Sequence, residues 1–307
     1  MDTTFGDGGF ATSKSLDSGP GIRSVMALQA DGKILVTGAG LIGRYTSTGQ
    51  LDTTFGTNGF AALNATVATG IAVQSDGKIL VTTGVAAPTQ LFGSPGVPAP
   101  GTGAIARYNT NGTLDTAFGI SGQASCVASA AGIALQSNGK IVVAGTITSA
   151  LQTVLESDGI TVADNQTGFG VVRYNANGSI DTTFNPGAGL GTGGGVVTGF
   201  GNSFPNGGAF ALAIQSNGEI VVAGMAGATS PQGTLNSSSF VLARYTTTGQ
   251  LDTSFGSNGI VTTTLDTFSF VSALVIQSDG KIVAAGNTGS AVGDFVDNFA
   301  VARYLAQ

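Results

Sequence analysis

The sequence has no histidine, no tryptophan and a single cysteine, Cys126, among its 307 residues. Without histidine the commonest general base is absent, so Ser-His-Asp and Cys-His catalytic arrangements cannot form. One cysteine excludes an intramolecular disulfide. Because Cys126 lies in the apolar stretch SCVASAAGIALQ, we expect it to be a small buried core residue and not a nucleophile.

Charge is also scarce, at 9% of the residues against a typical value of about 25%. The net charge is −6 and no basic stripe is present, which argues against nucleic acid as a partner. Residues 79–106 carry no charge, but four prolines and five glycines interrupt them, so we expect a loop and no membrane insertion. No basic segment followed by an apolar one opens the sequence, so no secretory signal peptide is expected within this numbering.

What the sequence does contain is one unit repeated five times. The string LDTTFG at residues 51–56 recurs as MDTTFG, LDTAFG, IDTTFN and LDTSFG at residues 1, 114, 180 and 251. The units span residues 1–50, 51–113, 114–179, 180–250 and 251–307. Such a period is typical of repeat architectures, so we expect residues 1–307 to form a single domain.

Each unit continues with the same landmarks. An apolar alternation ending in Gln leads into an Asp-Gly or Asn-Gly turn, as in MALQADGK, and a returning run such as KILVTG follows. This is a strong hairpin signal. A last run ends in Arg-Tyr, no helical period is sustained, and four strands per unit is the economical interpretation.

The sequence therefore predicts an all-β fold, a five-bladed β-propeller of four-stranded antiparallel blades. Neighbouring blades must stack to bury both sheet faces, and we expect the first blade to meet the fifth and close the ring. An open solenoid and a string of small sandwiches are the alternatives.

These landmarks resemble the bacterial delta-60 repeat family, whose units pair an LDTTFG segment with an AIQSDGKIVVAG hairpin and a strand ending in ARYN. The resemblance covers all five units and implies a β-propeller of the kind found in predominantly surface or secreted bacterial proteins. It implies no particular activity. The departures are Met1 in place of Leu or Ile, Asn185 in place of the motif Gly, and Glu219 in place of the hairpin Lys.

Spacing separates constant from variable connections. From Gln to the hairpin Lys or Glu the offset is four in every unit, and from Arg to the next Asp it is eight. By contrast, the gap between the third-strand Gly and the Arg holds 5, 22, 27, 19 and 16 residues. We expect the variable segments to share one face and to carry binding, although neutral decoration is an alternative. They are residues 85–104, 146–170, 187–208, 225–240 and 287–298.

The recurring arginines and aspartates are interpreted as structural pairs that lock each blade to the next, because five near-identical pairs cannot all be one active site. The pairs are Arg44 with Asp52, Arg107 with Asp115, Arg173 with Asp181, Arg244 with Asp252, and Arg303 with Asp2.

Candidate contacts to a partner or ligand lie in the variable segments, where aromatic rings can dock a protein or stack on a sugar. They are Phe92, Glu156, Asp158, Phe200, Asn202, Phe204, Asn236, Asp294 and Asp297. Carboxylates near 156–165 and 294–298 could offer oxygen ligands to calcium, but no EF-hand pattern is complete, so no metal or cofactor is predicted. Solvated loop charges and rings that plug their own loops are the alternatives.

The sequence thus predicts a non-enzymatic extracellular or cell-surface module that binds a protein partner or assembles with its own copies. One alternative is a glycan-binding propeller. The other is a carboxylate-dependent hydrolase or lyase at the ring axis, which needs two acidic side chains about 5–10 Å apart.

Overall fold

The computed structural model describes residues 1–16, 24–65, 67–84, 103–126, 129–148, 167–186, 194–200, 206–229, 235–290 and 298–306. Apart from one 3-10 turn, η1 (Lys14–Leu16), every regular element in these ranges is a β-strand. The all-β class is therefore confirmed. No helix in these ranges is long and apolar enough to cross a membrane.

The predicted hairpins form at the Asp-Gly and Asn-Gly turns. In the first unit, the Gln29 amide donates to the Lys33 carbonyl at 2.8 Å, and the Asp31 side chain accepts from the Lys33 amide at 3.1 Å. Gly32 adopts a φ of +82°, which a residue with a side chain rarely tolerates. The same turn recurs in all five units, so local sequence determines where each strand reverses.

The strands form five antiparallel meanders. The first contains β1 (Met26–Leu28), β2 (Ile34–Gly38), β3 (Leu41–Tyr45) and β4 (Phe60–Ala62). The second contains β5 (Val67–Val73), β6 (Ile79–Gly84), β7 (Ala104–Tyr108) and β8 (Gln123–Ser125). The third contains β9 (Ser129–Leu135), β10 (Ile141–Thr148), β11 (Thr167–Tyr174) and β12 (Gly195–Thr198).

The fourth contains β13 (Asn206–Ile214), β14 (Ile220–Thr229), β15 (Leu235–Tyr245) and β16 (Ile260–Thr263). One parallel bridge from Thr167 to Asn206 joins it to the third, so the two form one eight-stranded sheet. The fifth contains three strands among the described residues, β17 (Phe268–Ile276), β18 (Ile282–Gly289) and β19 (Asn298–Tyr304).

The meanders are offset from the sequence units by one strand, which corrects the expectation that one unit makes one blade. The short strand after each LDTTFG string pairs with the Arg-Tyr strand of the preceding unit: β4 with β3, β8 with β7, β12 with β11 and β16 with β15. The turn explains this, because the Asp52 amide donates to the Arg44 carbonyl and the Arg44 amide donates to the Gly59 carbonyl. The chain therefore folds back onto the strand that it has just left.

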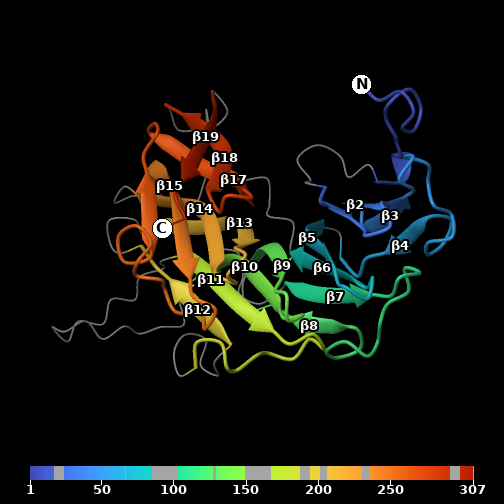
Figure 1. Ribbon diagram of the computed structural model, residues 1–307, viewed down its shortest axis with the longest axis horizontal. Helices are drawn as coiled ribbons and strands as arrows, with labels where there is room; N and C mark the ends of the chain where they lie inside the picture. The colour runs from blue at the N-terminus through green and yellow to red at the C-terminus, as the bar shows by residue number, and fades with distance from the viewer. Residues whose placement is uncertain are drawn as a thin grey trace.

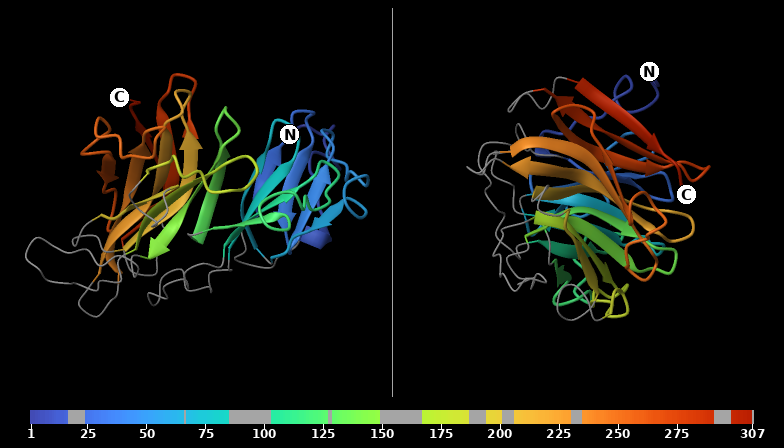
Figure 2. Two further views of the ribbon diagram at one scale, coloured as in Figure 1. Left: turned by 90° about the horizontal axis from the view of Figure 1, so that it is seen from below. Right: turned by 90° about the vertical axis from the view of Figure 1, so that its left-hand side faces the viewer.

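Successive meanders pack side by side in an arc (Figures 1 and 2), with β1 against β5, β5 against β9, β9 against β13, and β13 against β17. Apolar side chains fill the space between neighbours; Leu35 and Ile42 of the first meander join Ile79 and Val81 of the second in one core cluster. The first and fifth meanders lie at opposite ends of the arc (Figure 1). The expected contact between them is therefore not made by the described residues.

Each meander has two distinct ends. Tyr45 pairs with Ile34 at the end that carries the hairpin turn and the LDTTFG turn, and we call this the motif end. Leu41 pairs with Gly38 at the opposite end, which we call the loop end. The connections between the second and third strands, which vary in length, leave the strands at the loop end, and most of their residues lie outside the described ranges.

The expectation of one variable face is wrong for the fourth unit, where the LDTTFG turn at the motif end is also longer: Gly194, whose amide donates to the Phe184 carbonyl, follows Phe184 by ten positions, whereas Gly59 follows Phe55 by four.

Candidate functional site

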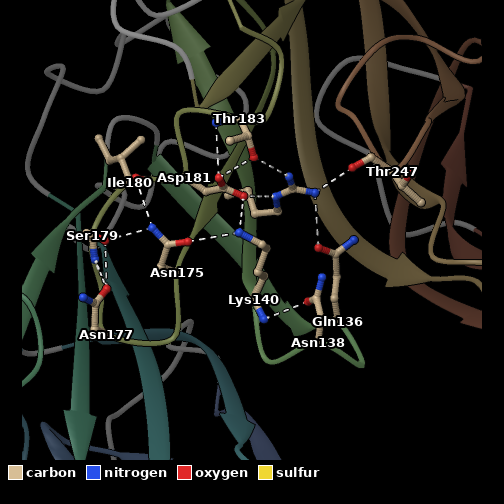
Figure 3. A network of polar contacts seen from close by, with 11 residues as sticks. Gln136, Asn138, Lys140, Asn175, Asn177, Ser179, Ile180, Asp181, Thr183 and Thr247 are labelled. Atoms are coloured by element: carbon tan, nitrogen blue, oxygen red, sulfur yellow. Dashed lines mark hydrogen bonds and ion pairs between the residues drawn. The ribbon is translucent and has the colours of Figure 1, made fainter.

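One polar cluster of the motif end is centred on the ion pair of Arg173 and Asp181. Figure 3 shows this cluster from close by, with Asp181, Lys140, Thr183 and Thr247 labelled. The Arg173 Nε donates to Asp181 Oδ2 at 2.7 Å, and Arg173 Nη1 donates to the Thr247 carbonyl of the next meander at 2.6 Å. The guanidinium carbon lies 4.6 Å from the centre of the Phe184 ring. Both charged side chains are buried. A buried ion pair of this kind therefore bridges two neighbouring meanders.

Further contacts hold the Asp181 carboxylate. Lys140 Nζ, from the hairpin, lies 2.7 Å from Asp181 Oδ2, and Thr183 donates to Oδ1 through its hydroxyl at 2.6 Å. Burial raises the pKa of Asp181, but the hydrogen bonds from Lys140, Thr183 and Arg173 outweigh it and hold the pKa well below its ordinary value. The carboxylate stays ionised and has no free lone pair for proton transfer, which suits a structural role.

The cluster recurs in four copies. The Arg Nε to Asp Oδ2 distances are 2.8 Å for Arg44–Asp52, 2.8 Å for Arg107–Asp115, 2.7 Å for Arg173–Asp181 and 2.7 Å for Arg244–Asp252. In each copy Nη1 donates to a carbonyl of the following meander, at Thr110, Ala176, Thr247 and Ala306 respectively. The predicted pairs thus lie together in four copies, and each also contacts the next meander.

The fifth pair is not brought together. Arg303 is exposed on β19, whereas Asp2 is exposed near the N-terminus and its carboxylate accepts hydrogen bonds from Thr4, at 3.0 Å from the amide and 2.6 Å from the hydroxyl. The Thr4 hydroxyl, followed by the Thr4 amide, lowers the pKa of Asp2.

Sequence reasoning gave no role to the phenylalanine of the LDTTFG string. Phe55, Phe118, Phe184 and Phe255 are buried, and each lies under the guanidinium of its cluster at 4.5 to 4.7 Å. Such cation–π contacts add to the ion pair. The signal was present, because every unit has Phe three residues after the motif Asp.

Cavities open beside the clusters, between neighbouring hairpins. One of about 650 Å³ is lined by Gln136, Asn138, Gln215 and Asn217, and one of about 960 Å³ lies between the first two hairpins. The buried Oε1 atom of Gln215 has no hydrogen-bond partner among the described residues. The polar lining suits water or another hydroxyl-bearing molecule, since an unpaired buried carbonyl is costly.

Most predicted contact residues lie outside the described ranges: Phe92, Glu156, Asp158, Asn202, Phe204, Asp294 and Asp297. Asn236 is exposed on β15 near the loop end. Phe200 packs edge-on against Phe169 of β11, with ring centres 4.8 Å apart, which favours the alternative that its ring packs within its own loop region and does not contact a partner. Within the described part of the chain, no three acidic or cysteine side chains gather as metal ligands.

Cys126 lies buried in the core between the second and third meanders, as expected. Burial raises the pKa of its thiol to about 12, so the thiolate that a nucleophile requires is not populated at neutral pH.

A family model matches five segments of the sequence, and the matches follow the repeats described above. Residues 29–55, 99–118, 158–184, 215–255 and 277–307 match the family model described as "Domain of unknown function (DUF5122) beta-propeller". The chain matches a β-propeller repeat family. The first four matched segments end at the Phe of the motif, at residues 55, 118, 184 and 255. Each segment also contains the Arg that stacks on that Phe. The sequence matches no curated protein.

Solved structures resemble the chain in fold alone. An ulvan lyase of polysaccharide lyase family PL25 is 10% identical, with 95% of this chain and 70% of that chain covered and a TM-score of 0.51. A Bacteroides caccae protein of unknown function is 13% identical over 88% and 73% of the chains, with a TM-score of 0.43. The extracellular domain of a B. thetaiotaomicron one-component system is 14% identical over 91% and 27%, with a TM-score of 0.40. The chain thus spans about a quarter of that last protein.

Proposed function

We propose that this protein is a non-enzymatic, extracellular or cell-surface interaction module that contacts a protein partner, or further copies of itself, through the loop end of its meanders. The observation that carries the proposal is that most of the length variation lies at one end, since only the fourth unit lengthens a turn at the motif end. The motif end keeps the Gln-to-Lys or Glu and Arg-to-Asp spacings and the buried ion pairs, while the connections at the loop end differ several-fold in length. Binding residues are usually carried by loops on a rigid scaffold.

The proposal extends to the fold. Each meander is one blade of a five-bladed propeller, and each blade has four strands. The delta-60 resemblance, in which surface or secreted proteins predominate, supports an external location, as does a sequence rich in Thr, Ser, Asn and Gly in which 9% of the residues are charged. Protease treatment of intact producing cells tests this location. The protein should be degraded if it lies on the cell surface and should stay intact if it lies inside the cell.

The absence of enzymatic activity is part of the proposal. In each of the four clusters the Arg and Asp side chains form an ion pair with each other, and the thiol of Cys126 is protonated and buried. The lyase alternative needs a pair of carboxylates about 5–10 Å apart over the axis. Turnover of polyuronides by the purified chain would contradict a non-enzymatic module.

A short-loop variant tests the binding face. Replacing residues 84–102 with one alanine gives Thr83-Ala-Gly103-Ala104, which repeats the Gly38-Ala39-Gly40-Leu41 connection of the first meander. The exposed hairpin substitution Ser137→Asp is the matched control at the motif end. Self-association is measured by sedimentation velocity, and contacts with other surface proteins by cross-linking on producing cells. The proposal requires association that the short-loop variant weakens and the control keeps.

Glycan binding is the second candidate, because loop amides and phenylalanines suit sugars. A glycan array with the full chain and with Phe204→Ala separates the two. If the chain binds the array, Phe204→Ala abolishes that binding and the chain does not self-associate, the glycan-binding function is favoured over the protein-binding one.

A further inference from the structure

A cavity at the motif end separates the hairpins of the third and fourth meanders. Its volume is about 650 Å³, within the range of about 300–1,000 Å³ that is usual for small-molecule sites. Residues 135–138 and 214–218 of the two hairpins line it, together with Arg173 and Thr247. The cavity lies at the end opposite to the variable loops, so binding through the loop end gives it no role.

Two glutamines form the buried part of the lining, and only one of them has partners for its carbonyl oxygen. Gln136 is 8% exposed; its Nε2 donates to the Gly218 carbonyl at 3.3 Å, and its Oε1 accepts from Arg173 Nη1 at 3.5 Å (Figure 3). Gln215 is 7% exposed, and its buried Oε1 atom has no hydrogen-bond partner among the described residues. The fourth hairpin therefore presents one unused acceptor.

The fold holds this acceptor in place. The Gln215 amide donates to the Glu219 carbonyl at 2.8 Å, and the Gln215 carbonyl accepts from the Gly218 amide at 2.9 Å, so the backbone of the turn is fixed. Buried polar atoms in folded proteins nearly always have a partner, and leaving one unpaired is costly. A molecule with a hydrogen-bond donor that enters the cavity would relieve this cost.

Donors lie at the exposed rim of the same cavity. The Oδ1 atoms of Asn138 and Asn217 accept from backbone amides of their own turns, both at 3.1 Å. This arrangement leaves the two side-chain NH₂ groups as donors, beside the exposed hydroxyls of Ser137 and Ser216. A ligand there meets donors at the rim and an acceptor inside.

The charges favour an uncharged ligand. No Asp or Glu side chain of the described residues lines this cavity, and its one charged lining group, Arg173, is bonded to Asp181 and to the Thr247 carbonyl. By contrast, the cavity between the first two hairpins is lined by Asp31 and Lys33, whose charged atoms lie 3.3 Å apart. An ion would therefore find no free counter-charge between the third and fourth hairpins.

We propose that the cavity between the third and fourth hairpins binds a neutral pyranose sugar, either free or at the end of a longer glycan. Sugar hydroxyls both donate and accept, so one hydroxyl donates to Gln215 Oε1 while others accept from the asparagine NH₂ groups. Leu135 and Ile214 add aliphatic surface to the lining for the C–H groups of the ring. The proposal is independent of binding through the loop end.

Saturation-transfer difference NMR with the full chain detects the sugar. The probes are D-glucose, D-galactose, D-mannose and N-acetyl-D-glucosamine, followed by titration of any sugar that gives a signal. A glycan array that carries the same four sugars at chain ends distinguishes the two sources. Binding on the array assigns the site to the end of a glycan, and binding in solution alone assigns it to the free sugar.

Gln215→Met keeps the length of the side chain and removes the acceptor. The affinity for the sugar should fall about tenfold, the equivalent of one hydrogen bond. Stability to urea should stay the same or rise, because the unpaired carbonyl is gone, whereas Gln136→Met should be less stable because it loses two hydrogen bonds. Gln277→Met, at the exposed equivalent position of the fifth hairpin, is the matched control and should bind like the wild type.

Absence of binding by the wild type, at concentrations well above the millimolar range expected for so small a ligand, would mean that the cavity holds water only and would overturn the proposal. Unchanged affinity in Gln215→Met would overturn it too, as would a loss of stability there like that of Gln136→Met. Ser216→Leu fills the rim from an exposed position and should also weaken binding, so the test does not depend on one variant.

The loop-end proposal can fail separately. The short-loop variant should bind the sugar with wild-type affinity, because residues 84–102 do not line this cavity. Array binding that Phe204→Ala abolishes and Gln215→Met keeps would place the glycan at the loop end and overturn the site between the hairpins.

Discussion

The two ends of each meander follow opposite rules. At the motif end, an Arg, an Asp and a Phe keep the same spacing and nearly the same distances in four copies. At the loop end, the connection between the second and third strands is the two-residue turn Ala39-Gly40 in the first meander and holds 19, 18, 5 and 8 residues in the others. The two side chains of a buried ion pair must reach each other, because either charge alone is costly to bury. An insertion between the Arg and the Asp would separate them. A surface connection between two paired strands can lengthen with only a small loss of stability, because loop-closure free energy grows slowly with length.

Substitution of a clustered arginine is expected to have the largest effect. Arg173→Gln leaves Asp181 buried without its guanidinium and removes the bond to the Thr247 carbonyl. The free energy of unfolding should fall by about 3–5 kcal/mol, measured by urea denaturation followed by circular dichroism. Lys14→Gln, outside the four clusters, should change it by less than about 0.5 kcal/mol. Equal stability of Arg173→Gln and the wild type would refute the lock.

Glycine positions separate backbone strain from packing at the motif end. Gly112 and Gly139 have φ values of +88° and +80°, but a Cβ on Gly112 would lie 3.0 Å from the Phe55 ring, whereas one on Gly139 meets only Ala176 at 4.0 Å. Gly139→Ala should cost about 1 kcal/mol from strain. Gly112→Ala should cost about 2–3 kcal/mol because the stacked ring must also move. Similar melting temperatures for the two variants would show that the Phe55 stack is loose.

Acid should weaken the motif end. The hydroxyl of Thr54, with Arg44 and Lys33, lowers the pKa of Asp52 to about 2 from 3.8. A carboxylate with a lowered folded pKa stabilises the fold above its unfolded pKa, and this contribution is lost as pH falls through the folded value. The free energy of unfolding should therefore decline from about pH 4 to pH 2. In Asp52→Asn the decline should be shallower; an unchanged pH slope would mean that the carboxylate contributes nothing.

The sequence predicted the elements that local chemistry controls. The Asp-Gly and Asn-Gly hairpins, the all-β class and the spacing of the Arg–Asp pairs follow from residues that are close along the chain. The assignment of β4 to the preceding unit could not be predicted, because a repeat gives the period of an array and not its phase. The carbonyl acceptors at Thr110, Ala176 and Thr247 were also hidden, because a backbone oxygen leaves no residue signature.

One cluster lacks a hydroxyl that the others have. Asp52 and Asp181 accept from the hydroxyls of Thr54 and Thr183, but Asp115 has Ala117 at the equivalent position and accepts only its amide there, at 3.2 Å. Ala117 is exposed, so a larger side chain has room. Ala117→Thr should stabilise the fold by about 0.5–1 kcal/mol. Thr183→Ala is the reverse control and should lower the melting temperature; a stabilising Thr183→Ala would exclude the hydroxyl as the cause.

No loss of stability is expected when the loop end is shortened. The short-loop variant keeps the Gly103 carbonyl that accepts from the Cys126 amide at 2.9 Å, as the Gly40 carbonyl accepts from the Leu63 amide at 2.8 Å in the first meander. Because loop-closure free energy changes by only about 0.6 kcal/mol per doubling of length, the shorter connection should raise stability by about 1–2 kcal/mol or leave it unchanged. Urea denaturation measures this. A loss comparable to that of Arg173→Gln would mean that residues 84–102 hold the sheets together, and the division between a locked end and a free end would not stand.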